Sequence, residues 1–196
     1  TVTVKGEAAQ VRNFAHAVTI TGGTFTMEAG SICYNYSNGN SGVDIRGGAL
    51  ILNGGSIEEN EAVNHAGVHI SGGTFTMNGG EISENKARCF GGGIAVYGGT
   101  VEISGGTIKN NRAAARTYGS SPYEDVGGGG IYIKEGTVNF KDGTIRENFL
   151  DGAKKNCGAG VFIDAGGTFN MSGGTITDCK LNPDVATPEP SKGGGV

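Results

Sequence analysis

Residues 22–27 read Gly-Gly-Thr-Phe-Thr-Met, and the same six residues recur at positions 72–77. Related segments begin at Gly47, Gly98, Glu135 and Gly166, so the starts lie 25, 25, 26, 37 and 31 residues apart. A near-constant period of this length is typical of repeat proteins in which each repeat packs on the next one. The longer spacings fit the same repeat with insertions in its loops, and each period therefore predicts one coil of a solenoid.

Every repeat contains three short apolar alternations separated by glycine, which is the period of β-strands and not of helices. The second alternation places apolar side chains such as Phe25 and Met27 inside, and the third contributes one isoleucine, such as Ile32. So few apolar side chains form a core only if each coil covers its neighbour. The first alternation is expected at Val18–Ile20, Val43–Ile45, Val68–Ile70, Ile94–Val96, Ile131–Ile133 and Val161–Ile163.

An asparagine stands three residues after the isoleucine of the third strand in most repeats. Its side-chain amide is able to bond the backbone of its own bend and the amide of the next coil. The last full repeat has Cys179 at this position. The sequence therefore predicts a structural ladder of stacked amides formed by Asn35, Asn60, Asn85, Asn111 and Asn148.

The segments GGTFTM, GGGI at 91–94 and Gly-Thr-Ile-x-x-Asn resemble the glycine-rich repeats of bacterial surface proteins with a right-handed parallel β-helix. The resemblance covers about residues 18–196 and implies an all-β solenoid of about six coils of three short strands, with loop insertions at one corner. Residues 1–17 are expected to form an N-terminal strand and an imperfect coil or cap, and Gly193–Val196 to begin another coil. The family resemblance implies an extracellular or cell-surface location.

Composition excludes several classes of partner. The chain of 196 residues has a net charge of −4 and no dense block of Lys or Arg, so a nucleic-acid ligand is not expected. No apolar run approaches the length of a membrane span. The four cysteines lie at separated positions of the repeat, and the sequence predicts neither a cofactor nor a metal site.

The corner after the ladder position carries the insertions. The distance from the ladder residue to the glycine before the next first strand is 7 residues at Asn35 and 19 at Asn111. Solenoids often bind ligands through such loops, although tolerated surface insertion is the alternative explanation. The candidate binding residues at this corner are Arg112, Arg116, Tyr118, Tyr123, Glu124 and Asp125.

The middle residue of each first strand is expected to point outward. Adjacent coils then place Asp44 beside His69, and Tyr132 beside Phe162 as an aromatic platform for a sugar or protein side chain. If the chain is an enzyme, Asp44, His69 and Glu102 are the candidate catalytic residues, because glycan cleavage needs clustered acid and base groups.

Two metal-like patterns have simpler explanations. His65 and His69 are four residues apart, but across a glycine bend and not on a helix, so we expect no metal pair. An acidic column beside the ladder is either a cation site or a solvated edge, and consists of Glu59, Glu84, Glu147 and Asp178.

The sequence as a whole favours a non-enzymatic rod that acts in adhesion or assembly through its loop-bearing edge, with a glycan or protein ligand. Open coil ends also suggest self-association by strand addition. A carbohydrate-active enzyme of the polysaccharide lyase or hydrolase type, or a glycan-binding module, is the alternative, because β-helices support many functions.

Overall fold

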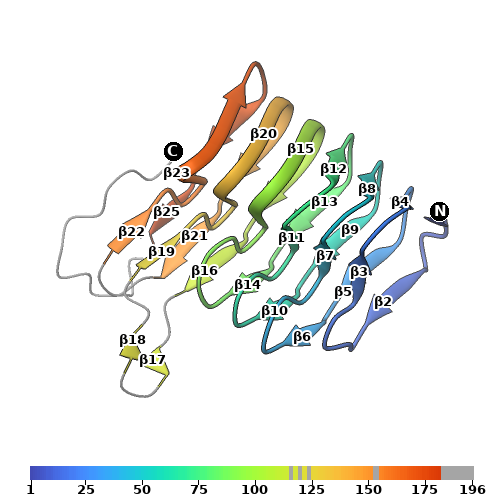
Figure 1. Cartoon of the computed structure of the whole chain (residues 1–196), viewed down its shortest axis with the longest axis horizontal. Helices are drawn as coiled ribbons and strands as arrows, with labels where there is room; N and C mark the ends of the chain where they lie inside the picture. The colour runs from blue at the N-terminus through green and yellow to red at the C-terminus, as the bar shows by residue number, and fades with distance from the viewer. Residues whose placement is uncertain (115–116, 119–120, 123–124, 152–154, 182–196) are drawn as a thin grey trace.

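The computed structural model describes residues 1–114, 117–118, 121–122, 125–151 and 155–181, and this part of the chain is all-β, without helices. Figure 1 shows strands from successive repeats lying side by side in layers. The layers form long parallel sheets, consistent with a β-solenoid. Within the described residues no helix is long and apolar enough to span a membrane.

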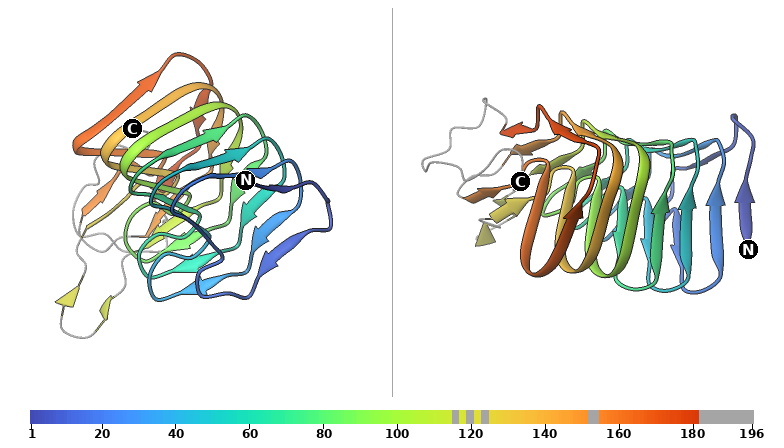
Figure 2. Two further views of the ribbon diagram at one scale, coloured as in Figure 1. Left: turned by 45° about the vertical axis from the view of Figure 1, so that its right-hand side comes forward. Right: turned by 90° about the horizontal axis from the view of Figure 1, so that it is seen from above.

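The first layer contains the six predicted first strands in register. Val18 pairs with Val43, Val43 with Val68, and Val68 with Ile94, so each step advances by one repeat. In the last three repeats the strand continues around the bends into the following layers (Figure 2). The strands are β3 (Val18–Ile20), β7 (Val43–Ile45), β11 (Val68–Ile70), β15 (Ile94–Lys109), β20 (Ile131–Arg146) and β23 (Val161–Met171).

The second and third layers also follow the predicted repeat. Phe25, Leu50, Phe75 and Val101 are successive partners in the second layer, and Ile32, Ile57, Ile82 and Ile108 in the third. The second layer adds β1 (Val2–Val4), β4 (Thr24–Met27), β8 (Ala49–Leu52) and β12 (Thr74–Met77). The third adds β2 (Gln10–Arg12), β5 (Ser31–Cys33), β9 (Ser56–Glu58), β13 (Glu81–Ser83) and β24 (Thr175–Thr177).

Each repeat has a fourth short strand, which corrects the prediction of three strands per coil. These strands follow the ladder position and form a separate parallel six-stranded sheet. Their inward residues are small in the first coils, including Ala62, Ala87 and Ala113, so no apolar alternation marks them in the sequence. They are β6 (Tyr36–Ser37), β10 (Glu61–Ala62), β14 (Lys86–Ala87), β16 (Arg112–Ala114), β21 (Phe149–Asp151) and β25 (Lys180–Leu181).

The insertions form additional strands beside the fourth layer, as Figure 1 shows. β17 (Thr117–Tyr118) and β18 (Ser121–Pro122) pair in the antiparallel direction as a hairpin. β19 (Asp125–Gly127) and β22 (Lys155–Cys157) pair in the parallel direction, one repeat apart. The longest loops therefore gather at one corner, as the offsets predict.

The core is a narrow column of apolar side chains between the first three layers. Leu50, Phe75, Val101 and Val138 in the second layer are fully buried, as are Ile57 and Ile82 in the third. Because like residues stack from coil to coil, burial of each depends on both neighbouring coils. A second small cluster of Ala113, Val126, Leu150 and Ala159 fills the space under the fourth layer.

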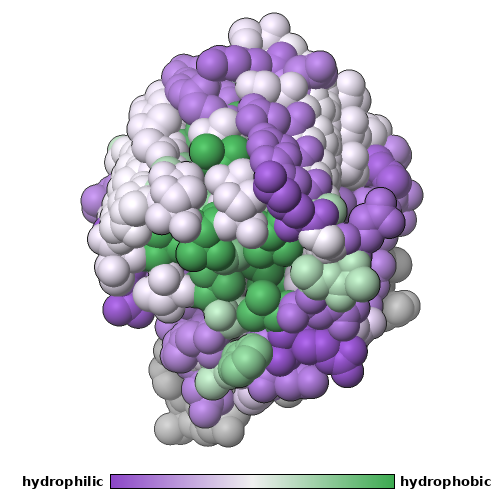
Figure 3. Space-filling view, turned by 90° about the vertical axis from the view of Figure 1, so that its right-hand side faces the viewer, coloured by the Kyte–Doolittle hydropathy of each residue, from purple (hydrophilic) through white to green (hydrophobic). Residues whose placement is uncertain are grey.

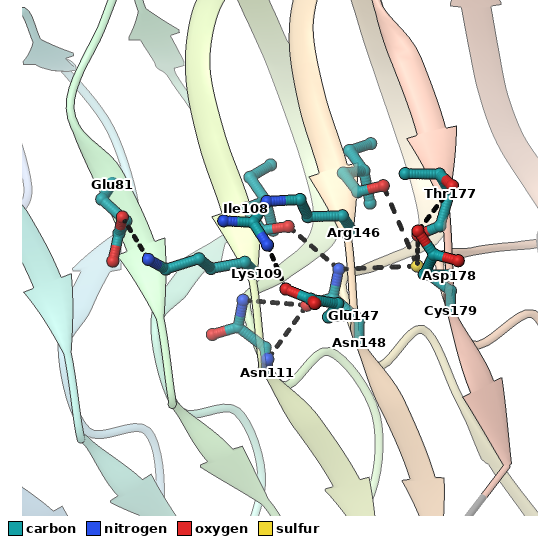
Figure 4. A network of polar contacts seen from close by, with 11 residues as sticks. Glu81, Ile108, Lys109, Asn111, Arg146, Glu147, Asn148, Thr177, Asp178 and Cys179 are labelled. Carbon is teal, nitrogen blue, oxygen red and sulfur yellow. Dashed lines mark hydrogen bonds and ion pairs between the residues drawn. The ribbon is translucent and has the colours of Figure 1, made fainter.

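The predicted asparagine ladder is confirmed by its hydrogen bonds. The Asn85 side-chain Nδ2 donates to Oδ1 of Asn111 at 3.0 Å and to the carbonyl of Ile57 at 2.8 Å. The backbone N–H of Asn85 also donates to Oδ1 of Asn111, at 3.1 Å. The pattern repeats from Asn35 to Asn148, and Figure 4 shows its end, where Nδ2 of Asn148 lies 3.7 Å from Sγ of Cys179.

Residues 1–17 stack on the next coil through β1 and β2. Val2 pairs with Phe25 and Val11 with Ile32, while the backbone N–H of Phe14 donates to Oδ1 of Asn35 at 3.0 Å. The coil end formed by these residues exposes apolar side chains, which appear green in Figure 3. Residues 193–196, predicted to start another coil, lie outside the described residues.

Candidate functional site

The outward face of the first layer is the best candidate site, because titratable and aromatic side chains gather on it. The register places Asp44 beside His69 and Tyr132 beside Phe162, as the repeat predicts. This face is not bare, since side chains from the preceding loops and from the residues after the strands fold over it. We call the resulting group the outer cluster: Asn40, Asp44, Arg46, His65, His69, Phe90, Tyr97, Tyr132 and Phe162.

The polar end of the outer cluster is a buried carboxylate with three partners. Oδ1 of Asp44 lies 2.7 Å from Nδ1 of His69, and its Oδ2 accepts a hydrogen bond from Nε of Arg46 at 2.9 Å. The third partner is the Asn40 amide, whose Nδ2 donates to Oδ1 of Asp44 at 3.5 Å. Burial alone would raise the pKa of Asp44, but the hydrogen bonds from His69 and Arg46 together lower it. Asp44 is therefore ionised and orients the His69 ring through an Nδ1–H donor.

His65 occupies the middle of the outer cluster and is 7% exposed. Its Nδ1 donates to the carbonyl of Phe90 at 2.8 Å, since a carbonyl oxygen only accepts. Burial lowers the pKa of His65 to about 4, so the ring is neutral at pH 7. The ring stacks on His69 with centroids 4.9 Å apart and 5° between the planes.

Parallel stacking bears on the use of the two histidines as metal ligands. Ring nitrogens bind a metal approximately in the plane of the ring, at 2.0 to 2.1 Å for zinc. Two parallel planes direct their lone pairs side by side and not toward one ion. Among the described residues, no group of three or more His, Cys, Asp or Glu is placed to hold a metal.

The aromatic end of the outer cluster is covered, although the sequence predicted an outward platform. Tyr132 is 3% exposed, because Phe90 stacks on it with centroids 4.6 Å apart and Phe162 lies at 5.5 Å. The Tyr132 hydroxyl donates to Oδ2 of Asp164 at 3.1 Å. Phe162 is partly exposed whereas Tyr132 is buried, so the two rings named from the sequence do not form one open face.

Tyr97 joins the two ends of the outer cluster. Its ring lies 4.8 Å from His65 and 5.7 Å from Tyr132, and the ammonium of Lys134 lies 5.1 Å from its centroid. Burial raises the pKa of Tyr97 to about 12, so the hydroxyl stays protonated. Strand alternation did not predict Tyr97 or His65 as parts of this site, because neither is the middle residue of a first strand.

Glu102 lies in the second layer, between Thr76 and Asn139, and not on the face of Asp44 and His69. Its carboxylate accepts a hydrogen bond from Nδ2 of Asn139 at 2.5 Å and pairs with Nζ of Lys141 at 2.7 Å. The hydrogen bond from Lys141, followed by that from Asn139, lowers the pKa of Glu102. The three candidate catalytic residues therefore do not converge on one substrate position.

At the loop-bearing corner only part of the predicted binding set is described. Arg112 in β16 forms an ion pair with Asp151 in β21, whose carboxylate is 4% exposed. Tyr118 lies in β17 and Asp125 in β19, without described side chains. Arg116, Tyr123 and Glu124 lie outside the described residues. Asp151 was not singled out from the sequence, because a lone acidic residue after β21 carries no motif.

The acidic column beside the ladder has an unusual backbone conformation. Glu59, Glu84, Glu147 and Asp178 all have φ between 50° and 55°, as do Tyr34 and Asn110 at the same place in their coils. This left-handed conformation costs energy for residues other than glycine, and asparagine tolerates it best. Neighbouring side chains satisfy some carboxylates, for example the Tyr34 hydroxyl, which donates to Glu59 at 2.6 Å.

The cysteines provide no shared site within the described residues. Cys33, Cys89 and Cys179 are free thiols, and the side chain of Cys157 is not described. Burial raises the pKa values of Cys89 and Cys179, which disfavours their reactive thiolate forms.

No protein-family model, curated protein or solved structure matches the chain.

Proposed function

We propose that this chain is a stretch of right-handed parallel β-helix from a bacterial surface or secreted rod, with a structural or adhesive role. The observation that carries the proposal is the asparagine ladder, which joins successive coils from Asn35 to Asn148 without interruption. Such a ladder stiffens the stack, whereas length variation is confined to one corner. A stiff scaffold with one variable edge suits display of loops to a partner.

The binding surface in this proposal is the corner from Arg112 to Val126, together with the neighbouring β22. The partner is a glycan or a protein at an extracellular or cell-surface location. The pairing of β19 with β22 supports this, because it anchors two successive insertions on each other. Because these loops are attached to the scaffold at both ends, they lose less conformational entropy when a partner binds.

The test removes the corner and retains the coil. Deletion of residues 115–125 shortens the 19-residue corner to 8, the length found after Asn85. The wild-type protein, immobilised on beads, is first screened on a glycan array and on bacterial and host cells. We expect the deletion to weaken any binding found at least tenfold, with unchanged circular dichroism and melting temperature.

The matched control is Thr76→Ala, a change on the second layer away from this corner. It should bind like the wild type. Binding that survives the deletion, or that Thr76→Ala removes equally, contradicts the assignment of the binding surface.

A carbohydrate-active enzyme is a second candidate, favoured by one observation. The Asp44 carboxylate holds Nδ1–H of His69 at 2.7 Å, which leaves Nε2 of that ring as a positioned base. Release of reducing ends or unsaturated products from a polysaccharide panel measures this activity. Turnover that Asp44→Ala and His69→Ala abolish would support the enzyme, whereas the scaffold proposal expects neither turnover nor any effect of these changes on binding.

Self-association through the coil ends completes the proposal. The described stack exposes apolar side chains at both ends, with Val2 and Phe14 at one end and Ile163 and Met171 at the other. Exposed strand edges add further strands readily. Light scattering over a concentration series, with negative-stain imaging, should show rods that lengthen with concentration, and a stable monomer contradicts this part.

A further inference from the structure

His65 links three consecutive coils at the corner before the first layer. Its carbonyl accepts the backbone N–H of Ser41 at 3.1 Å, and its imidazole donates to the carbonyl of Phe90 at 2.8 Å. The same ring stacks on His69 and contacts Tyr97. His65 therefore fixes the loop between β10 and β11 over the outer cluster through both its backbone and its side chain.

The surroundings of the ring do not suit a positive charge. The carboxylate whose charge acts on the ring, Asp44, is already paired with His69 and with the guanidinium of Arg46. Arg88 and Glu61 beside the loop pair with each other at 3.1 Å. Other titratable or charged groups near the ring, among the described residues, include Lys86, Cys89, Tyr97, Tyr132, Lys134 and Asp164.

We propose that His65 is an acid-released latch: the neutral ring holds residues 63–67 on the outer cluster, and its protonation frees this loop and uncovers His69 and Tyr97. A protonated ring would lie parallel to His69, 4.9 Å away, and the described carboxylate that acts on it, Asp44, already has His69 and Arg46 as partners. In water the same charged ring is hydrated, and the cost of burying its charge is absent. Protonation therefore favours the released loop.

The direction of the pH dependence follows from the two states of the ring. With the loop in place, burial lowers the pKa of His65 to about 4. When the loop is released, the pKa of the ring returns toward its ordinary value of about 6.5. His65 thus binds a proton at a higher pH when the loop is released than when the loop lies over the outer cluster. As the pH falls through this interval, the ratio of released to seated loop rises at most tenfold per pH unit, or roughly 300-fold in total.

Hydrogen exchange measured by mass spectrometry tests the latch. Protection factors of residues 61–67, relative to an unstructured peptide at the same pH, should fall at least tenfold between about pH 6.5 and pH 3.5. The amides of β12 (Thr74–Met77), in the buried second layer, should keep their protection and so distinguish loop release from global unfolding.

Two variants separate His65 from the other histidines. His65→Phe keeps an aromatic ring without a titratable group, and His65→Asn keeps an N–H donor for Phe90; both should make protection of residues 61–67 independent of pH. His16→Phe, at an exposed histidine, should retain the wild-type response. The latch is overturned if wild-type protection does not change with pH, if the response persists in both His65 variants, or if β12 loses protection in parallel.

Discussion

Replacement of Asn85 by alanine should strongly destabilise the middle of the stack. Asn85 is fully buried, and its side chain takes part in four hydrogen bonds, two as donor and two as acceptor. Alanine leaves the carbonyl of Ile57 and the backbone N–H of Asn60 without these partners. With about 1 kcal/mol for each lost bond, we expect the free energy of unfolding to fall by about 4 kcal/mol.

Urea denaturation followed by far-ultraviolet circular dichroism measures this loss, since the chain has no tryptophan. The matched control is Asn78→Ala, at an exposed asparagine that donates one hydrogen bond to Asn53. Its effect should stay within about 0.5 kcal/mol. A loss below about 1.5 kcal/mol for Asn85→Ala, or equal losses for both variants, would refute the ladder as a main source of stability.

Three further changes lie in or beside the asparagine ladder. Gly67→Ala should lower the free energy of unfolding by about 2 kcal/mol, because its Cβ would lie 2.3 Å from the carbonyl oxygen of Gly93; Gly22→Ala, with no atom within 4 Å, should have almost no effect in the same urea titration. Glu84→Asn should raise the free energy of unfolding by about 0.5 to 1 kcal/mol, since asparagine tolerates a φ of 55° better than glutamate. Cys179→Asn should raise the melting temperature, because an amide oxygen accepts from Asn148 more strongly than the thiol sulfur at 3.7 Å; an unchanged or lower value argues against extension of the ladder.

The first three layers and the ladder were predictable because their signals repeat. Each inward position recurs with a nearly constant period, so a single apolar residue such as Ile57 gains meaning from Ile32 and Ile82 in the same column. Asparagine at the bend is equally informative, because a buried amide needs partners and the next coil supplies an identical one. Register in a stack of this kind follows directly from the sequence.

The fourth strand was not predictable by the same argument. In the first three coils it has two residues, such as Glu61 and Ala62, of which one is small and points inward, and burial of an alanine leaves little hydrophobic pattern. The strand exists because the chain must return from the ladder bend to the first layer beside its neighbour, where the backbone groups pair. The path of the chain therefore determines where the fourth strand forms, and the strand preferences of its side chains do not.

The outer cluster marks the limit of reasoning from strand alternation. Alternation correctly separates Tyr132 and Asp44 from the apolar core. Both side chains point away from the core, yet other side chains bury them. Asn40 and His65 each stand four residues before an outward strand residue, and both lie over the first layer because the corner loop turns back across it. A coil with a longer corner, such as that after Asn85, brings Phe90 to this face instead, five residues before Ala95. In these three coils corner length therefore determines which loop position lies over the first layer, and the residue type at that position determines whether the partner is polar or aromatic.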